Sequence, residues 1–480
     1  MLAKRVARNV LYNSSSIIIS NAAGLLISVY LARTLQKELF GVYSLTISVA
    51  FLLMVFTDLG INATTVRFCA RAFSKGDYEE LRGYFKFLTK IKISLSIFSS
   101  LLLFLLSDFL SQNVFREEAL SLPLKFASIL LLFLPLSGYL TSVFNAFNDF
   151  KANFVRAVSY EFSRVIAIIS LVTLGLSVIG AILGYVVASI TATVTLLSLL
   201  VKRYGRILFG KEKKIEKRGV LKFTSYLTIG SITWTIFAYV DSVMIGIFMP
   251  VEYVGYYRIA LLVVSAISGI LSVPAVMFPV FVALEGEDLR TAFKRAFKYS
   301  SMIAVPVAFG LPAIAKPVIR VAFGAEYLPA VTALWILSLL ILRAALGFWG
   351  NIFNAKGMPE YPVYVLSLAM VMNVLLNYLL IPIFGISGAA LATVASNALN
   401  WIALALLSKR IFNVFFDAWD LIKPVISSLV MLGVILNIKP KTIPEGILMI
   451  FVGAAVYFLV LWLLRGVSRK DIDYLWNAFK

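Results

Sequence analysis

Long apolar segments separated by short polar loops are the dominant feature of this sequence. A helix needs about 20 mostly apolar residues to cross the hydrocarbon core of a bilayer. About fourteen windows of this kind are present: 10–32, 39–66, 91–110, 119–145, 155–176, 178–201, 221–247, 254–283, 299–322, 329–354, 361–383, 386–408, 421–438 and 446–464. The chain is 61% hydrophobic and 14% charged, whereas soluble domains are roughly 45–50% apolar and about 25% charged. We therefore predict an all-α polytopic membrane protein with about 14 transmembrane helices.

Two of the apolar stretches, 155–201 and 361–408, are too long for a single span. We divide the first at Leu176-Ser177-Val178 and the second between Pro382 and Gly385. Each stretch then supplies two helices, which keeps the number of spans even.

In a soluble protein a net charge of +20 would suggest nucleic-acid binding. Here the basic residues lie mainly in the loops between the apolar segments. The cytoplasmic side of a membrane protein is the side richer in Lys and Arg. With the N-terminus inside, 33 of the 44 Lys and Arg fall on one side, including the loop from Arg67 to Lys92, the pair Lys151 and Arg156, and the stretch 202–222. Eight fall on the other side and three within spans. The charge pattern predicts a cell-membrane protein with both termini in the cytoplasm and no nucleic-acid partner.

Other counts exclude whole classes of catalytic site. The chain has no histidine, which removes imidazole-dependent zinc and Ser-His-Asp sites. Its single cysteine, Cys69, cannot form an internal disulfide. The longest loop is about 25 residues and no G-x-x-x-x-G-K-[ST] motif is present. We therefore expect a transporter rather than an enzyme, with no bound metal or cofactor.

Weak internal repeats occur in the same order in both halves of the chain, 207 to 214 positions apart. Examples are Phe144-Asn145-Ala146 with Phe353-Asn354-Ala355, and Gly180-Ala181 with Gly388-Ala389. Six spans per repeat give both halves the same topology, an arrangement typical of transporters that rock about a midplane site. We expect a six-helix bundle over 1–205, a basic cytoplasmic linker over 206–220, a second bundle over 221–410, two further spans over 411–464 and an amphipathic cytoplasmic tail over 465–480.

Several short motifs resemble those of one transporter family. They are Leu31-Ala32-Arg33-Thr34-Leu35, Phe40-Gly41-Val42-Tyr43-Ser44, Asp58-Leu59-Gly60 with Arg67, the loop from Gly76-Asp77-Tyr78, and Ser468-Arg469-Lys470-Asp471 before the tail. With them the chain resembles the polysaccharide exporters, the Wzx-type lipid-linked oligosaccharide flippases of the multidrug/oligosaccharidyl-lipid/polysaccharide superfamily. The resemblance covers essentially the whole chain.

The resemblance implies a fold, a cargo and a set of partners. The fold would be two pseudo-symmetric six-helix bundles in a V shape with an alternating-access passage. The cargo would be a glycan on a polyprenyl phosphate or pyrophosphate, moved from the cytoplasmic to the outer leaflet. Coupling to a proton, a sodium ion or the membrane potential is expected, with a monomeric transport unit in the lipid bilayer that works beside glycan-assembly proteins.

Two other activities of the same superfamily remain open. A cation-coupled multidrug antiporter would share the fold, although the first span contains no Asp or Glu to serve as a coupling site. A lipid II flippase would need a cluster of arginines, whereas the first span has only Arg33, at its outer end. A membrane-embedded glycosyltransferase is less suited to this chain because it would need a large catalytic loop or domain.

Ionisable residues inside spans are costly and are the natural site candidates. Arg343 lies near the middle of its span and could bind a phosphate or an acidic sugar, or pair with Asp241. Arg258 lies one turn inside the outer end of its span and, by the resemblance, would line the central cleft. Asp241 on the preceding span could pair with Arg258 or bind a coupling cation.

The remaining candidates lie in the first half of the chain. Glu161 and Arg164, spaced i,i+3, share one helix face and can neutralise each other. Asp58 and Arg67 are nine residues apart, on opposite sides of a straight helix, so they are not expected to pair. We place Arg67 at the cytoplasmic interface, Asp58 facing a gate and Arg33 among the cavity candidates.

Overall fold

The computed structural model describes residues 2–271, 273–438 and 443–467. Within these ranges the chain forms helices and no strand. Eleven helical stretches are long and apolar enough to cross a membrane, and two of them, Ser15–Lys75 and Phe150–Leu208, reach 61 and 59 residues and contain breaks. The predicted all-α membrane class is confirmed, while the count of fourteen spans stays a prediction. Residues 468–480, where we expect most of a surface helix, lie outside the described residues.

The chain divides into two compact units, unit 1 (Met1–Arg258) and unit 2 (Ile259–Lys480). The helices of unit 1 are α1 (Leu2–Leu53), α2 (Val55–Asp58), α3 (Ile61–Lys75), α4 (Tyr78–Phe109), α5 (Ser121–Ala146), α6 (Phe150–Leu171), α7 (Ser177–Leu208) and α8 (Lys217–Phe248). The boundary falls inside α9 (Glu252–Ile270). Unit 2 holds α10 (Val273–Ala283), α11 (Gly286–Ala322), α12 (Ala330–Leu337), α13 (Arg343–Leu346), α14 (Phe348–Ala355), α15 (Glu360–Phe384), α16 (Ile386–Phe412), α17 (Trp419–Leu436) and α18 (Ile443–Leu463). The domain boundary predicted at 206–220 stays a prediction.

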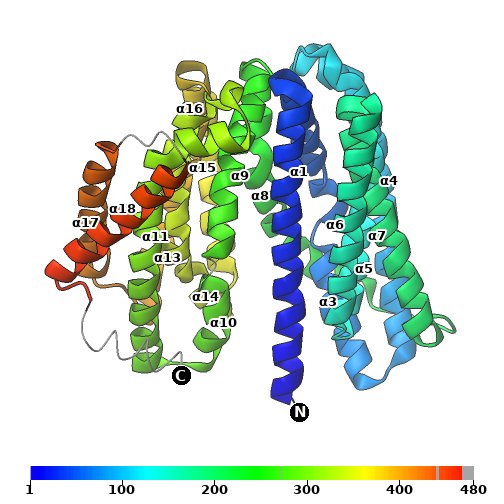
Figure 1. Ribbon diagram of the computed structural model, residues 1–480. Helices are drawn as coiled ribbons and strands as arrows, with labels where there is room; N and C mark the ends of the chain where they lie inside the picture. The colour runs from blue at the N-terminus through cyan, green and yellow to red at the C-terminus, as the bar shows by residue number, and fades with distance from the viewer. Residues whose placement is uncertain (1, 272, 439–442, 468–480) are drawn as a thin grey trace. The chain divides into compact units, whose positions relative to one another are not determined.

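Two tight helical hairpins, α6 with α7 and α15 with α16, lie at the predicted divisions of the long apolar stretches (Figure 1). Ser177 and Gly385, 208 residues apart, begin the second helix of each hairpin with nearly the same backbone angles, φ 48° and ψ −130° against φ 58° and ψ −137°. A Cβ added at Gly180 or at Gly388 would collide with the backbone of the preceding helix. Both predicted divisions are therefore confirmed, and the two halves share local geometry at matched positions.

A break in unit 1 separates α2 from α3, inside the single span predicted over 39–66. Leu59 (φ 42°) and Gly60 (φ 79°) are both left-handed, and a helix broken in this way leaves peptide groups without partners. The Leu59 carbonyl accepts a hydrogen bond from the Thr228 hydroxyl of α8 at 2.9 Å. The hydroxyls of Thr64 and Thr224 lie 3.0 Å apart. Polar contacts thus hold the break against α8.

The segment between α7 and α8 lies along α4, although most of its side chains are exposed. Arg82 donates from Nε to the Ile207 carbonyl at 2.8 Å, and the Lys213 amide donates to the Glu79 carbonyl at 3.1 Å. Lys86 pairs with Glu212 at 2.9 Å. The basic linker predicted over 206–220 therefore has a fixed path on unit 1.

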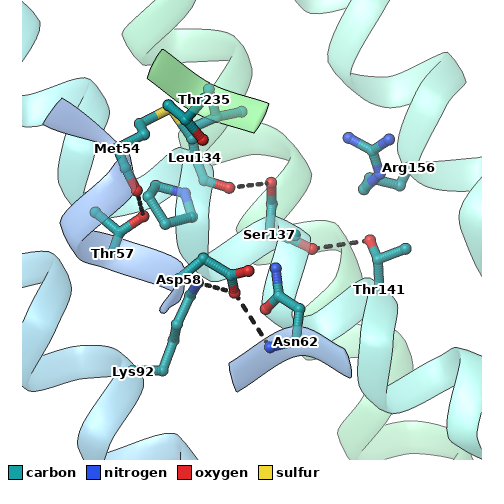
Figure 2. A pocket seen from close by; sticks show the side chains of 12 residues that line it. Met54, Thr57, Asp58, Asn62, Lys92, Leu134, Ser137, Thr141, Arg156 and Thr235 are labelled. Carbon is teal, nitrogen blue, oxygen red and sulfur yellow. Dashed lines mark hydrogen bonds and ion pairs between the residues drawn. The ribbon is translucent and has the colours of Figure 1, made fainter. Parts of the chain in front are cut away.

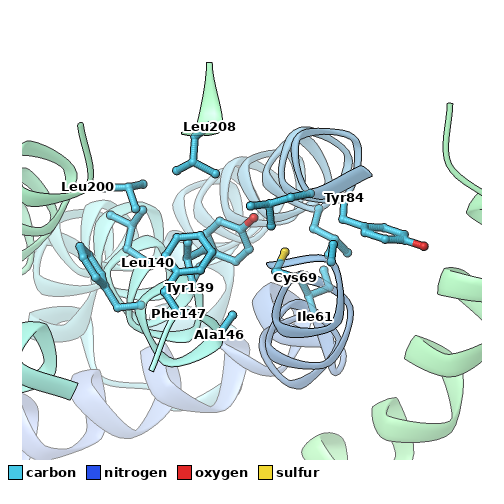
Figure 3. Packing of buried hydrophobic residues seen from close by; sticks show 14 of the residues in the cluster. Ile61, Cys69, Tyr84, Tyr139, Leu140, Ala146, Phe147, Leu200 and Leu208 are labelled. Atoms are coloured by element: carbon cyan, nitrogen blue, oxygen red, sulfur yellow. The ribbon is translucent and has the colours of Figure 1, made fainter. Parts of the chain in front are cut away.

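Each unit has its own apolar core. In unit 1, Cys69, Tyr139 and Leu200 are buried together where α3, α4, α5 and α7 meet (Figure 3). The Tyr139 hydroxyl is satisfied by Thr89, 2.8 Å away. In unit 2 the fully buried Trp349 packs on Phe293, with 4.4 Å between ring centroids. These cores keep the helices in place around the cavities described next.

Candidate functional site

Unit 1 has an open cavity of about 330 Å³, lined mostly by polar residues, among α2, α3, α4, α5, α6 and α8 (Figure 2). Most of its lining side chains are polar, although the surrounding helices are apolar. The lining residues are Met54, Thr57, Asp58, Asn62, Lys92, Leu134, Pro135, Ser137, Gly138, Thr141, Arg156 and Thr235. Ionisable groups at this depth are costly unless they pair or bind something, which makes this cavity the leading candidate for a functional site.

An ion pair between Asp58 and Lys92 forms one wall of the cavity. Lys92, on α4, is 1% exposed, and its Nζ lies 3.4 Å from Asp58 Oδ1. The same carboxylate oxygen accepts a hydrogen bond from the backbone amide of Asn62 at 3.1 Å and so caps the start of α3. Asp58 therefore joins α4 to the helix break at Leu59 and Gly60.

Arg156, on α6, supplies a second positive charge to the cavity (Figure 2). Its Nε is buried and has no hydrogen-bond partner among the described residues. The Asn62 side-chain oxygen is likewise buried without a partner. The cavity lining thus holds one carboxylate and two cations, and only Lys92 of the two cations pairs with that carboxylate.

Two of these side chains were not predicted as site residues from the sequence. The charge pattern counts Lys92 and Arg156 with the cytoplasmic loops, whereas both line the cavity from helices that begin earlier than predicted. A usable signal was present for Lys92: Asp77 caps α4 by accepting the Glu80 amide at 3.0 Å, so Lys92 lies almost four turns into the helix. No comparable cap precedes Arg156, since the Asp149 side chain does not cap α6.

Glu161 and Arg164 form an ion pair of 2.6 Å, as their i,i+3 spacing predicts. Both side chains are buried in unit 1 but do not line the cavity. The Arg164 guanidinium lies 5.0 Å from the ring centre of Tyr185, and the hydroxyls of Tyr185 and Tyr43 are 3.0 Å apart. The structure supports the structural role for this pair, and contact with a substrate stays a prediction.

The other candidates lie apart from the cavity lining. Arg67 is exposed on α3 and stacks 4.0 Å from the ring centre of Phe223, so it does not pair with Asp58, as expected. Arg33 is an exposed residue of α1. The binding roles predicted for both stay predictions.

Asp241, Arg258 and Arg343 are likewise not cavity residues. Asp241 is buried on α8 and accepts a hydrogen bond from the Tyr257 hydroxyl at 2.8 Å. Arg258 is half-buried on α9, within electrostatic range of Tyr239. Arg343 begins α13 of unit 2 with an exposed side chain. Their predicted ion pairs and substrate contacts stay predictions.

Unit 2 contains a cavity of similar volume, about 320 Å³, with the opposite chemistry. It lies between α11, α17 and α18 and is almost entirely apolar. Met302, Met431 and Met449 contribute flexible side chains to it. The Tyr457 hydroxyl, its main polar group, donates to the Met302 carbonyl at 2.9 Å. Nothing in the sequence pattern had indicated this cavity.

Comparison with known proteins decides the family. The family model described as polysaccharide biosynthesis protein matches residues 6–285, more than half of the chain. The chain belongs to the polysaccharide biosynthesis protein family. This membership confirms the resemblance inferred from the short motifs.

Relatives in the family come from archaea and bacteria. An uncharacterized membrane protein of Methanocaldococcus jannaschii is 25% identical over 95% of this chain and 94% of its own length. A Haloferax volcanii protein named as a probable low-salt glycan biosynthesis flippase is 27% identical over 51% of this chain and 53% of its own. The Escherichia coli lipopolysaccharide biosynthesis protein WzxC is 22% identical over 84% of this chain and 78% of its own.

Solved structures show that the fold is shared more widely. A lipid II flippase, MurJ, in an inward closed conformation superposes with a TM-score of 0.78 at 18% identity, over 94% of this chain and 98% of that chain. An inward-facing multidrug resistance transporter gives a TM-score of 0.66 at 18% identity, over 82% and 94%. The chain therefore has the fold of this transporter superfamily.

Proposed function

We propose that this protein moves an oligosaccharide linked to a polyprenyl phosphate or pyrophosphate from the cytoplasmic to the outer leaflet. A sugar headgroup cannot cross hydrocarbon unaided because its hydroxyls and phosphates would lose their hydrogen bonds there. The observation that carries the proposal is an open cavity, lined by charged and polar side chains, among the apolar helices of unit 1 in a member of this family.

Each cavity, taken by itself, offers one kind of chemistry. The polar cavity of unit 1 offers charges and hydrogen-bonding groups of the kind a headgroup requires. The apolar cavity of unit 2, with its adaptable methionines, suits part of a polyprenyl tail.

The proposal includes a setting and a driving force. The protein would lie in the cell membrane with both termini in the cytoplasm and would act as a monomeric transport unit beside glycan-assembly proteins. It would carry out no covalent chemistry and hold no cofactor. A proton, a sodium ion or the membrane potential would drive the movement.

Removal of the protein from its own cells tests this function. Lipid-linked glycan should accumulate in the cytoplasmic leaflet, where a membrane-impermeant lectin reaches it in inverted vesicles but not in intact cells. Expression of the wild-type chain should restore the outward pool. An outward pool of normal size and rate in the depleted cells, combined with increased drug sensitivity, would favour the antiporter and reject the proposal.

A further inference from the structure

The hydroxyl groups that line the cavity of unit 1 present acceptors rather than donors. Each one donates its hydrogen to a backbone carbonyl of its own chain segment, at 2.7 Å for Thr57, 2.8 Å for Ser137 and 2.9 Å for both Thr141 and Thr235. A hydroxyl has one hydrogen and two lone pairs. After this donation only the lone pairs are left for a molecule in the cavity.

Two further acceptors add to this lining. The buried Asn62 Oδ1 has no partner among the described residues. Both polar contacts of the Asp58 carboxylate use Oδ1, which leaves Oδ2 to accept from another donor. A molecule that satisfies this cavity must therefore bring several hydrogen-bond donors of its own.

The charge of Arg156 favours an anionic group in the same molecule. Lys92 is committed to Asp58, whereas Arg156 has no ion-pair partner in the described part of the chain. Glu161 on the same helix attracts Arg156 electrostatically but forms its direct ion pair with Arg164, at 2.6 Å. A guanidinium binds a carboxylate or phosphate through two parallel hydrogen bonds, so Arg156 marks the acidic end of the site.

We propose that this cavity binds one acidic sugar unit, with its anionic group on Arg156 and its hydroxyls donating to the lining oxygens. Poly-hydroxylated anions of this kind include a hexuronate and a hexose phosphate, which share the required chemistry. The cavity volume of about 330 Å³ lies at the lower end of the roughly 300–1,000 Å³ of small-ligand sites, which suits a single ring. The inference rests on the proposed function and deepens it by naming the part of the glycan headgroup that unit 1 recognises.

Binding of four soluble probes to the purified full-length protein in detergent tests the site. We expect D-glucuronate, D-glucose 1-phosphate or both to bind at least about tenfold more tightly than D-glucose or inorganic phosphate, since a charge-assisted pair is worth about 1.5–3 kcal/mol and 1.4 kcal/mol is tenfold. A preference for glucuronate identifies a uronic acid unit, and a preference for the sugar phosphate identifies the linkage to the carrier. Binding of glucose that is as tight as the binding of both acidic sugars, tighter binding of phosphate alone, or no binding of any sugar overturns the proposal.

Variants assign the binding to this cavity. Arg156→Gln should abolish the preference for acidic sugars, and Arg156→Lys should restore part of it because the charge returns without the planar fork. Thr141→Val removes one acceptor without changing the charge and should weaken acidic sugars severalfold. The matched control Arg71→Gln, at an exposed position on α3, should bind as the wild type does. Unchanged binding by both Arg156→Gln and Thr141→Val contradicts the assignment.

The same experiment separates this inference from the proposed function. If no acidic sugar binds while lipid-linked glycan still reaches the outer leaflet only in the presence of the protein, the cavity has been misassigned and the transport function stands. If acidic sugars bind but the glycan reaches the outer leaflet without the protein, the site stands and the transport function fails.

Discussion

At the residue scale, the pair of Asp58 and Lys92 shows how charges are tolerated inside unit 1. Lys92 is 1% exposed, whereas the Asp58 side chain is 29% exposed to the cavity. A buried charge that loses its partner is far more costly than an exposed one. The charge of Lys92 therefore depends on Asp58 more than the charge of Asp58 depends on Lys92.

Asp58→Asn should lower the free energy of unfolding by about 3 kcal/mol, because it leaves the Lys92 ammonium buried without a counter-charge. Lys92→Met should cost less, since the remaining carboxylate is open to the cavity. The double variant should resemble Lys92→Met rather than the sum of the two changes. Denaturant unfolding in mixed micelles measures all three.

Lys90→Met is the matched control for this pair, since Lys90 is exposed on the same helix. Its effect should stay within about 0.5 kcal/mol. If Asp58→Asn costs no more than Lys90→Met, the ion pair does not stabilise unit 1.

The site was predictable from the sequence only in part, for a reason that these residues make plain. Asp58 stood out because a carboxylate lies in an apolar segment. Lys92 and Arg156 lie near the predicted ends of spans, where the charge pattern of membrane proteins places loop cations. Their inclusion in one cavity results from the convergence of α2, α4 and α6, which no local pattern records.

At the element scale, some helix breaks were predictable from the sequence, whereas the break between α2 and α3 depends on packing. The divisions at Ser177 and Gly385 were predicted because the apolar stretches were too long for single spans. The break at Leu59 and Gly60 lies within a span of ordinary length, and a leucine with φ of 42° has no sequence signal. Contacts with Thr224 and Thr228 of α8 hold it in place.

Gly60→Ala tests how closely α8 packs against the break, with Gly76→Ala as the control. Both glycines have positive φ, 79° and 72°. In both variants the left-handed conformation of the alanine therefore costs roughly 1–2 kcal/mol of stability. A Cβ at Gly60 would also lie 2.6 Å from the Leu227 Cβ, whereas nothing lies within 4 Å at Gly76.

Gly60→Ala should therefore lower the free energy of unfolding by about 3 kcal/mol and Gly76→Ala by about 1 kcal/mol. The difference should appear as a lower melting temperature for Gly60→Ala. Equal melting temperatures for the two variants would show that α8 does not press on the break.

At the scale of the whole molecule, the membrane class was predictable because the bilayer imposes it, and the family was predictable from the resemblance of short motifs. Spanning helices, loop charges and the motifs around Asp58 and Arg67 are all local in the sequence. The two cavities were not predictable, since they depend on which faces of distant helices meet. The docked path of the 206–220 segment likewise depends on Arg82, more than 120 positions earlier in the chain.

Reconstitution tests the central claim of lipid-linked glycan transport most directly. The purified protein would be placed in liposomes with a fluorescent polyprenyl diphosphate-linked oligosaccharide, and a membrane-impermeant quencher would report the fraction in the outer leaflet over time under an imposed ion gradient or membrane potential. We predict that the protected inner-leaflet fraction becomes accessible within minutes in vesicles with the protein and stays protected in empty vesicles and in vesicles with an unrelated helical membrane protein. A protected fraction that decays no faster with the protein than without it would contradict the account.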